Sequence, residues 1–198
     1  MNKRLWLLSA FVLAALAQLA VPAWMIRQHE LTLREGQVFL FRTSPVDPID
    51  AFRGRFVWLS LEPATVKPPK VNDWTRGQKA YAVLGTDTNG FATVLRLERS
   101  RPADEPAIAV RVNWPEVDSG EIHFSWEGLD RYYMTERKAP AAEKAYRQHN
   151  ARSNRTCHVA VRVRGNQASI EELFIENRPI RLWLEEHPAA MDLDRPTI

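Results

Sequence analysis

The stretch His158-Val-Ala-Val-Arg-Val163, followed after Gly165-Asn166 by Ser169-Ile-Glu-Glu-Leu-Phe-Ile175, decides the fold. In its first half three valines alternate with His, Ala and Arg, so an extended strand here has one apolar face and one mostly polar face. Gly165-Asn166 supplies the positive φ angles that a tight hairpin needs. The stretch therefore predicts a β-hairpin that lies half buried against a core.

The same kind of pattern recurs upstream, where short runs rich in Val, Phe, Ile, Leu and Trp are separated by clusters of turn residues. Thr88-Asn89-Gly90 marks a second tight hairpin, and Pro140–His149 is the one clear helix outside the N-terminal region. The sequence predicts a mainly β (α+β) fold: a compact, mostly antiparallel β sandwich or barrel with one or two short helices. The expected strands are Val38–Arg42, Phe56–Leu61, Lys79–Leu84, Phe91–Leu97, Ala107–Val112, Glu121–Phe124, Cys157–Arg164 and Ser169–Ile175.

The N-terminus has the pattern of a membrane anchor. Lys3 and Arg4 precede an apolar run from Leu5 to Ile26 in which Gln18 is the only strongly polar residue, and about 20 apolar residues suffice to cross a bilayer. Trp6 and Trp24 stand roughly 27 Å apart in a helix, which places one indole near each membrane interface. We expect a transmembrane helix in residues 1–27, a β-rich domain in 28–186 and a flexible tail in 187–198.

A cleaved signal peptide is the competing interpretation of this segment. Ala15-Leu-Ala17 and Val21-Pro-Ala23 both resemble small-x-small cleavage sites, although the apolar run is longer than the core of a typical signal peptide. Both interpretations give the same topology, because Lys3 and Arg4 hold the N-terminus in the cytoplasm. The expected location is the inner (cytoplasmic) membrane, with a single pass and the bulk of the chain in the periplasm.

The charge balance of the outer region excludes nucleic acid as a partner. Without Lys3 and Arg4, the chain has 25 basic and 24 acidic residues. This near-neutral balance lacks the excess of positive charge that binds a polyanion. The basic and acidic side chains are also interleaved along the chain, as on solvated strand faces.

Few residues of the sequence are candidates for a disulfide, a metal site or a catalytic site. Cys157 is the only cysteine, so no intramolecular disulfide can form, and its neighbour His158 should point to the opposite face of the strand. Glu121 and His123 share a strand face but supply only two metal ligands. The sequence predicts no metal site, no cofactor and no catalytic residue.

The aromatic residues allow two interpretations. They could form a stacking platform for a glycan or a peptide, but in a disulfide-free β domain such residues more often build the core. The set comprises Trp58, Trp114, Trp126, Trp183, Phe91, Phe124, Tyr132 and Tyr133.

The segment from Thr43 to Leu61 carries a resemblance to a known family. It is similar to bacterial membrane-anchored proteins named for the motif Gly-Asp-Tyr-x-x-Leu-x-Tyr, in which a Pro-Val-Asp-Pro-type turn and an arginine precede the glycine. Arg55 replaces the motif aspartate, Phe56 the first tyrosine and Leu61 the last tyrosine. The similar residues are Pro45, Val46, Asp47, Pro48, Asp50, Phe52, Arg53, Gly54, Phe56, Val57 and Leu59. The resemblance covers nearly the whole chain and implies a membrane-tethered outer domain that serves as an accessory to a polytopic membrane protein.

The motif itself can be a scaffold or a recognition site. Prolines stiffen the turn, aspartates accept its amide hydrogens, and loops on rigid sheets often bind partners. The candidate binding residues are Asp47, Asp50, Arg53, Gly54 and Phe56.

The predicted function is a non-catalytic accessory or interaction module for an integral membrane partner. The alternative is a membrane-anchored hydrolase in which Ser44 is activated by Lys79, or less readily by Lys67 or Lys70.

Overall fold

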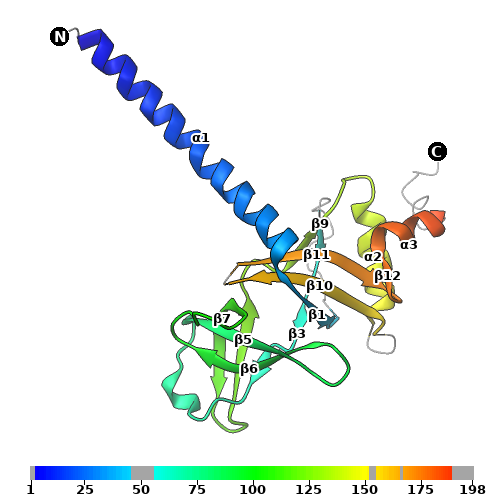
Figure 1. Ribbon diagram of the computed structural model, residues 1–198. Helices are drawn as coiled ribbons and strands as arrows, with labels where there is room; N and C mark the ends of the chain where they lie inside the picture. The colour runs from blue at the N-terminus through cyan, green and yellow to red at the C-terminus, as the bar shows by residue number, and fades with distance from the viewer. Residues whose placement is uncertain (1–2, 46–55, 152–154, 166, 189–198) are drawn as a thin grey trace.

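The computed structural model describes residues 3–45, 56–151, 155–165 and 167–188, which form one long helix followed by a β-rich domain (Figure 1). Helix α1 (Lys3–Glu35) continues without interruption through Pro22. Its Trp6–Glu35 segment is long and apolar enough to cross a membrane, and most of the helix extends away from the β domain (Figure 1). The expected apolar N-terminal helix is confirmed, and it runs to Glu35 because its last turns pack on the β domain.

Two five-stranded sheets and a short strand pair make up the domain. The first sheet has the order β12-β11-β10-β1-β3 and the second the order β4-β8-β7-β5-β6. The first contains β1 (Gln37–Thr43), β3 (Leu61–Glu62), β10 (Cys157–Arg164), β11 (Gln167–Ile175) and β12 (Arg178–Pro179). The second contains β4 (Thr65–Val66), β5 (Lys79–Thr86), β6 (Ala92–Glu98), β7 (Ala107–Glu116) and β8 (Glu121–Trp126), and the separate pair is β2 (Phe56–Trp58) with β9 (Arg131–Tyr133).

The strand pairing confirms the predicted antiparallel, mainly β architecture. Every pairing of named strands in the described chain is antiparallel. An isolated parallel bridge between Leu40 and Phe91 links the two sheets. The edge strands β4 and β6 contact each other, so the second sheet is nearly closed into a barrel.

The predicted hairpin at Thr88-Asn89-Gly90 connects β5 to β6 and follows from local chemistry. The Asp87 carboxylate accepts hydrogen bonds from the amides of Asn89 (2.9 Å) and Phe91 (2.8 Å). Gly90 has a φ of +84°, a conformation that glycine adopts at no steric cost. The amide of Phe91 contributes most to lowering the pKa of Asp87.

Several boundaries differ from the prediction. The expected strand Phe56–Leu61 is divided into β2 and β3, because the Leu59 amide donates to Asp130 O while the Ser60 carbonyl accepts from Ser44 N. Two helices cover one end of the first sheet, the predicted α2 (Ala139–His149) and the unpredicted α3 (Ile180–Glu186). A 3-10 turn spans Val71–Asp73. The part of the predicted tail from residue 189 onward lies outside the described residues.

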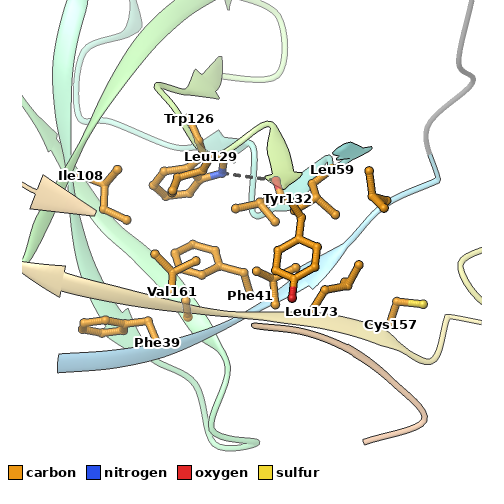
Figure 2. Packing of buried hydrophobic residues seen from close by; sticks show 14 of the residues in the cluster. Phe39, Phe41, Leu59, Ile108, Trp126, Leu129, Tyr132, Cys157, Val161 and Leu173 are labelled. Carbon is orange, nitrogen blue, oxygen red and sulfur yellow. Dashed lines mark hydrogen bonds between the residues drawn. The ribbon is translucent and has the colours of Figure 1, made fainter. Parts of the chain in front are cut away.

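A single hydrophobic core joins the two sheets (Figure 2). Phe41 of β1 meets the indole of Trp126 of β8 edge to face, with ring centroids 5.1 Å apart. The Trp126 Nε1 lies 3.1 Å from the carbonyl oxygen of Pro63 and 3.3 Å from that of Leu61, so the buried indole N–H has a partner. Other members are Phe39, Ile108, Leu129, Val161 and Leu173. Because residues from both sheets share one core, the described β region folds as one domain.

Candidate interaction site on the β2–β9 pair

The structure places one of the five predicted binding residues. Phe56 opens β2 and is half-buried. Asp47, Asp50, Arg53 and Gly54 lie outside the described residues. The site is therefore built from Phe56 and the described side chains around it.

The described half of the motif alternates between the core and the surface. Val57, Leu59 and Leu61 are buried in the main core, whereas Phe56, Trp58 and Ser60 are partly exposed. Leu61, which replaces the last tyrosine of the family motif, is a core residue, and an apolar side chain there needs no polar partner. The motif therefore has a structural face directed inward and a second face directed outward.

Four side chains from β2 and β9 form the outward surface, which we call the aromatic face: Phe56, Trp58, Arg131 and Tyr133. Phe56 is paired in register with Tyr133 and Trp58 with Arg131, so all four lie on the same side of the strand pair. The Phe56 ring centroid is 5.6 Å from that of Trp58 and 5.8 Å from that of Tyr133. The Arg131 guanidinium carbon lies 5.3 Å from the Phe56 centroid and 5.0 Å from that of Trp58. Cation–π contacts of this kind hold the guanidinium against the rings.

Tyr132 fixes β9 from the opposite side. Its side chain is buried, unlike those of its strand neighbours Arg131 and Tyr133, and its hydroxyl donates to Glu172 of β11 at 2.5 Å. Arg181 of α3 donates to the same hydroxyl oxygen at 3.2 Å. Burial, more than the Glu172 contact, raises the pKa of Tyr132 to about 12. The strand that carries half of the aromatic face is thus held to the first sheet and to α3.

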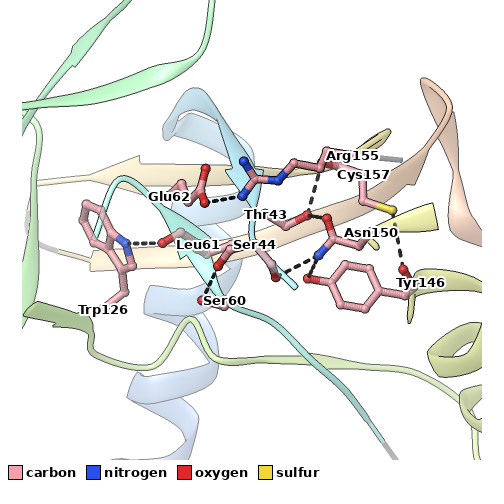
Figure 3. A network of polar contacts seen from close by, with 10 residues as sticks. All are labelled: Thr43, Ser44, Ser60, Leu61, Glu62, Trp126, Tyr146, Asn150, Arg155 and Cys157. Carbon is pink, nitrogen blue, oxygen red and sulfur yellow. Dashed lines mark hydrogen bonds and ion pairs between the residues drawn. The ribbon is translucent and has the colours of Figure 1, made fainter. Parts of the chain in front are cut away.

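A buried polar network anchors the chain just before residue 46 (Figure 3). The Asn150 amide nitrogen donates to Ser44 O at 2.8 Å and to the Tyr146 hydroxyl at 3.0 Å. The Thr43 hydroxyl lies 3.0 Å from Asn150 Oδ1 and 3.1 Å from Cys157 O. Ser44 N donates to Ser60 O, which ties the stem to the strand exit beyond β2. The network therefore fixes the stem of the segment that bears the predicted aspartates.

Tyr146 and Asn150 were not predicted as part of any site. Tyr146 lies on α2 and Asn150, four residues later, is its C-cap, so the two side chains meet at the end of the helix. This spacing of a tyrosine and an asparagine on a helix with several buried alanines is the signal that could have identified them.

Cys157 is inert in this environment. It is buried, and its Sγ lies 3.9 Å from the Tyr146 carbonyl oxygen. Burial raises the pKa of its thiol to about 12, so the nucleophilic thiolate is not formed at neutral pH.

Two adjacent hollows lie beside the network, with volumes of about 490 and 440 Å³. They share Arg42 and Glu62 as lining residues. Arg42 pairs with Asp87 at 2.9 Å and stacks over Phe91, while Arg155 pairs with Glu62 at 2.5 Å. Each guanidinium is thus matched by a carboxylate, and the hollows present ion pairs in place of an open anion site.

Ser44 and Lys67, which belong to the alternative Ser/Lys hypothesis, each contact another residue in the described structure. The Ser44 hydroxyl is 2.7 Å from that of Ser60, and Lys67 pairs with Glu121 at 3.4 Å on the second sheet. Lys79 is exposed on β5 and Lys70 is exposed ahead of the 3-10 turn. In the part of the chain that the structure describes, Ser44 forms its hydrogen bonds with Ser60 and Asn150.

Of the eight aromatic residues that could form either a stacking platform or the core, half are buried and half reach the surface. Trp126, Trp183, Phe124 and Tyr132 are buried in the core. The remaining four, Trp58, Trp114, Phe91 and Tyr133, lie wholly or partly at the surface, on three different parts of the domain.

Helix α1 is joined to the domain by direct packing. Thr32 is fully buried, and its hydroxyl lies 2.9 Å from Gln28 O and 3.2 Å from the Gln167 side-chain oxygen. His29 Nδ1 lies 3.0 Å from the Ser169 hydroxyl. Further contacts join Arg164 to Glu35 at 3.0 Å and the Arg162 guanidinium to Gly36 O at 3.2 Å. We call this set of contacts between α1 and the β10–β11 hairpin the helix joint.

These features define a class: a single β-rich domain carried directly on an N-terminal helix that is long and apolar enough to cross a membrane. A family model for GDYXXLXY proteins matches residues 18–173, from the middle of α1 into β11, and the chain belongs to this family. Comparison with curated proteins and with solved structures finds no match.

Proposed function

We propose that this protein is a non-catalytic, membrane-anchored interaction module whose β domain lies on the extracytoplasmic side and docks on a polytopic membrane protein. The helix joint is the observation that carries the proposal. A flexible tether would suffice to keep an independent enzyme near a membrane, whereas a packed joint fixes the height and orientation of the domain. Fixed placement serves a domain that must meet a second membrane-embedded surface.

The orientation follows from the charges at the start of the chain. Lys3 and Arg4 precede the apolar segment, and basic residues are retained on the cytoplasmic side. Residues after Ile26 are then extracytoplasmic. In a bacterium with two membranes this places the domain in the periplasm and α1 in the inner membrane.

The aromatic face is the proposed contact surface. Tyr, Trp and Arg are enriched where protein interfaces derive most of their binding energy. Tyr133 is 63% exposed while its neighbours Phe56 and Trp58 are held by ring contacts and by Arg131, so the surface is preorganised. Preorganisation lowers the entropic cost of binding. The expected partner surface is an extracytoplasmic loop region with apolar or acidic side chains that match the rings and the guanidinium.

Site-directed photocrosslinking in intact membranes tests this proposal. A photoreactive phenylalanine in place of Tyr133 should yield one defined crosslinked product that contains an integral membrane protein. The same probe in place of Leu95 is the matched control, because Leu95 is 58% exposed but lies on β6, away from the aromatic face. Absence of a defined product at position 133, or an equal product at position 95, would overturn the proposal.

A further inference from the structure

The end of the β7–β8 hairpin brings together three metal-ligating side chains. Glu116 closes β7, and Glu121 and His123 lie on β8. Glu116 is paired in register with Glu121, and His123 lies two residues further along the same strand, so all three point to one face. Their ligand atoms all lie within 4.8 Å of one another. Only Glu121 and His123 can be paired as ligands from the sequence, because strand pairing supplies the third ligand, Glu116.

From this cluster we propose a divalent transition-metal site that binds Zn²⁺ through Glu116, Glu121 and His123, with water completing the coordination. Imidazole and carboxylate are ordinary zinc ligands, and tetrahedral bonds of about 2.0–2.2 Å place ligand atoms roughly 3.2–3.6 Å apart. His123 Nε2 is already 3.5 Å from Glu116 Oε2. The Glu121 carboxylate oxygen lies within 4.8 Å of both of these atoms.

The surroundings hold the ligands in place. The His123 ring stacks on Trp114, with centroids 4.7 Å apart and an interplanar angle of 22°. The Ser119 hydroxyl donates to Glu116 Oε2 at 2.7 Å. Outer contacts of this kind orient metal ligands.

The charges at this position also favour a bound cation. Glu116 and Glu121 are directly opposite each other, and like charges at such positions repel. Lys67 partly compensates, since its Nζ lies 3.4 Å from Glu121 Oε1, but its side chain is 70% exposed and can move away. A divalent ion at the centre of the cluster would replace this weak contact.

Neither of the two hollows beside the polar network is lined by these residues. The inference therefore concerns metal binding and not a reaction. A bound ion would link β7 to β8 at the free end of their hairpin.

Calorimetric titration of Zn²⁺ into the full chain in neutral detergent micelles, without an affinity tag, tests the site. One equivalent should bind saturably, and His123→Ala and Glu116→Gln should each weaken binding at least tenfold. Lys67→Ala should tighten binding severalfold, because Glu121 is released. Glu127→Gln is the matched control, since Glu127 follows β8 directly but pairs with Arg111 outside the cluster. Absence of saturable binding, or binding that His123→Ala and Glu116→Gln leave unchanged, would overturn the inference.

Discussion

Gly36 follows helix α1 so closely that a Cβ atom at this position would overlap the carbonyl oxygen of Thr32 and lie 3.1 Å from Val163 N. The chain can turn from the helix into β1 here only because the residue has no side chain. The Thr32 and Val163 atoms both belong to the helix joint region, so this close approach fixes how α1 meets the β10–β11 hairpin.

Gly36→Ala should therefore loosen the joint and destabilise the domain. Overpacking of a close contact costs about 1–3 kcal/mol in the free energy of unfolding. Denaturant unfolding of the full chain in detergent, followed by tryptophan fluorescence, measures the loss. The exposed neighbour Gln37 supplies the control, since Gln37→Ala should change stability by less than about 0.5 kcal/mol. Equal stability of both variants would contradict the close-approach argument.

Asn150→Ala should destabilise the fold through the buried network. The change removes the partner of the Tyr146 hydroxyl and of Ser44 O, and a buried polar group left unpaired costs about 1–3 kcal/mol. Thermal or denaturant unfolding measures the effect. Asn113, whose side chain bonds Ser125 at an exposed position, is the matched control, and Asn113→Ala should be nearly neutral. A neutral Asn150→Ala would show that the network does not hold the motif stem.

The Cys157 thiol should be unreactive in the folded protein. Burial raises its pKa to about 12, so thiol reagents at pH 8 should modify the denatured chain far faster than the native chain. Because the thiolate is favoured in the unfolded state, the contribution of Cys157 to stability is complete below the unfolded pKa of about 8.5 and is lost as the pH rises towards 12. Fast native-state labelling at pH 8 would contradict the burial. Cys157→Ala should reduce the alkaline loss of stability, and the part that remains belongs to the buried tyrosines Tyr132 and Tyr146, whose pKa values are also raised.

Trp58→Ala should weaken partner retention without unfolding the domain. Trp58 is partly exposed and contacts Phe56 and Arg131 outside the main core. A central interface tryptophan typically contributes about 2 kcal/mol or more, which corresponds to more than a tenfold loss of affinity. Copurification from solubilised membranes measures retention, and Leu95→Ala, on β6 of the second sheet, is the control. Retention equal to that of the unchanged protein would exclude the aromatic face as the contact.

The mature protein should keep its N-terminal segment. Residues 28–35 continue α1 onto the domain, and a helix that is anchored at one end and spans the bilayer is retained. Mass measurement of protein extracted from membranes should show that the residues up to Ala23 are retained. A mass that corresponds to loss of the first 17 or 23 residues would instead show cleavage after Ala17 or Ala23.

Elements with strong local patterns could be predicted from the sequence, and elements made by tertiary pairing could not. β10 (Cys157–Arg164) has the predicted bounds, since its valine alternation reports one buried face. β4 and β12 have two residues each, and β9 three, so no periodicity can indicate them; they exist because a partner strand lies beside them. Helix α3 has only seven residues and is held by three buried side chains, which local propensity does not reveal.

The candidate site was predictable only in part, for the same reason. Phe56 was selected from the motif, but Arg131 and Tyr133 join it through the β2–β9 pairing, across more than 70 residues of sequence. Asn150 joins Thr43 in a comparable way. Which residues meet across the fold depends on the topology, and a single sequence contains no direct signal for these contacts.

In the proposed function, the helix joint holds the β domain in position for contact with a membrane partner. Insertion of a four-residue Gly-Ser linker between Glu35 and Gly36, combined with the photocrosslinking probe at position 133, tests it most directly. The protein should stay folded and membrane-bound while the defined crosslink falls to the level of the position 95 control. An undiminished crosslink in the linker variant would show that the contact does not depend on the helix joint.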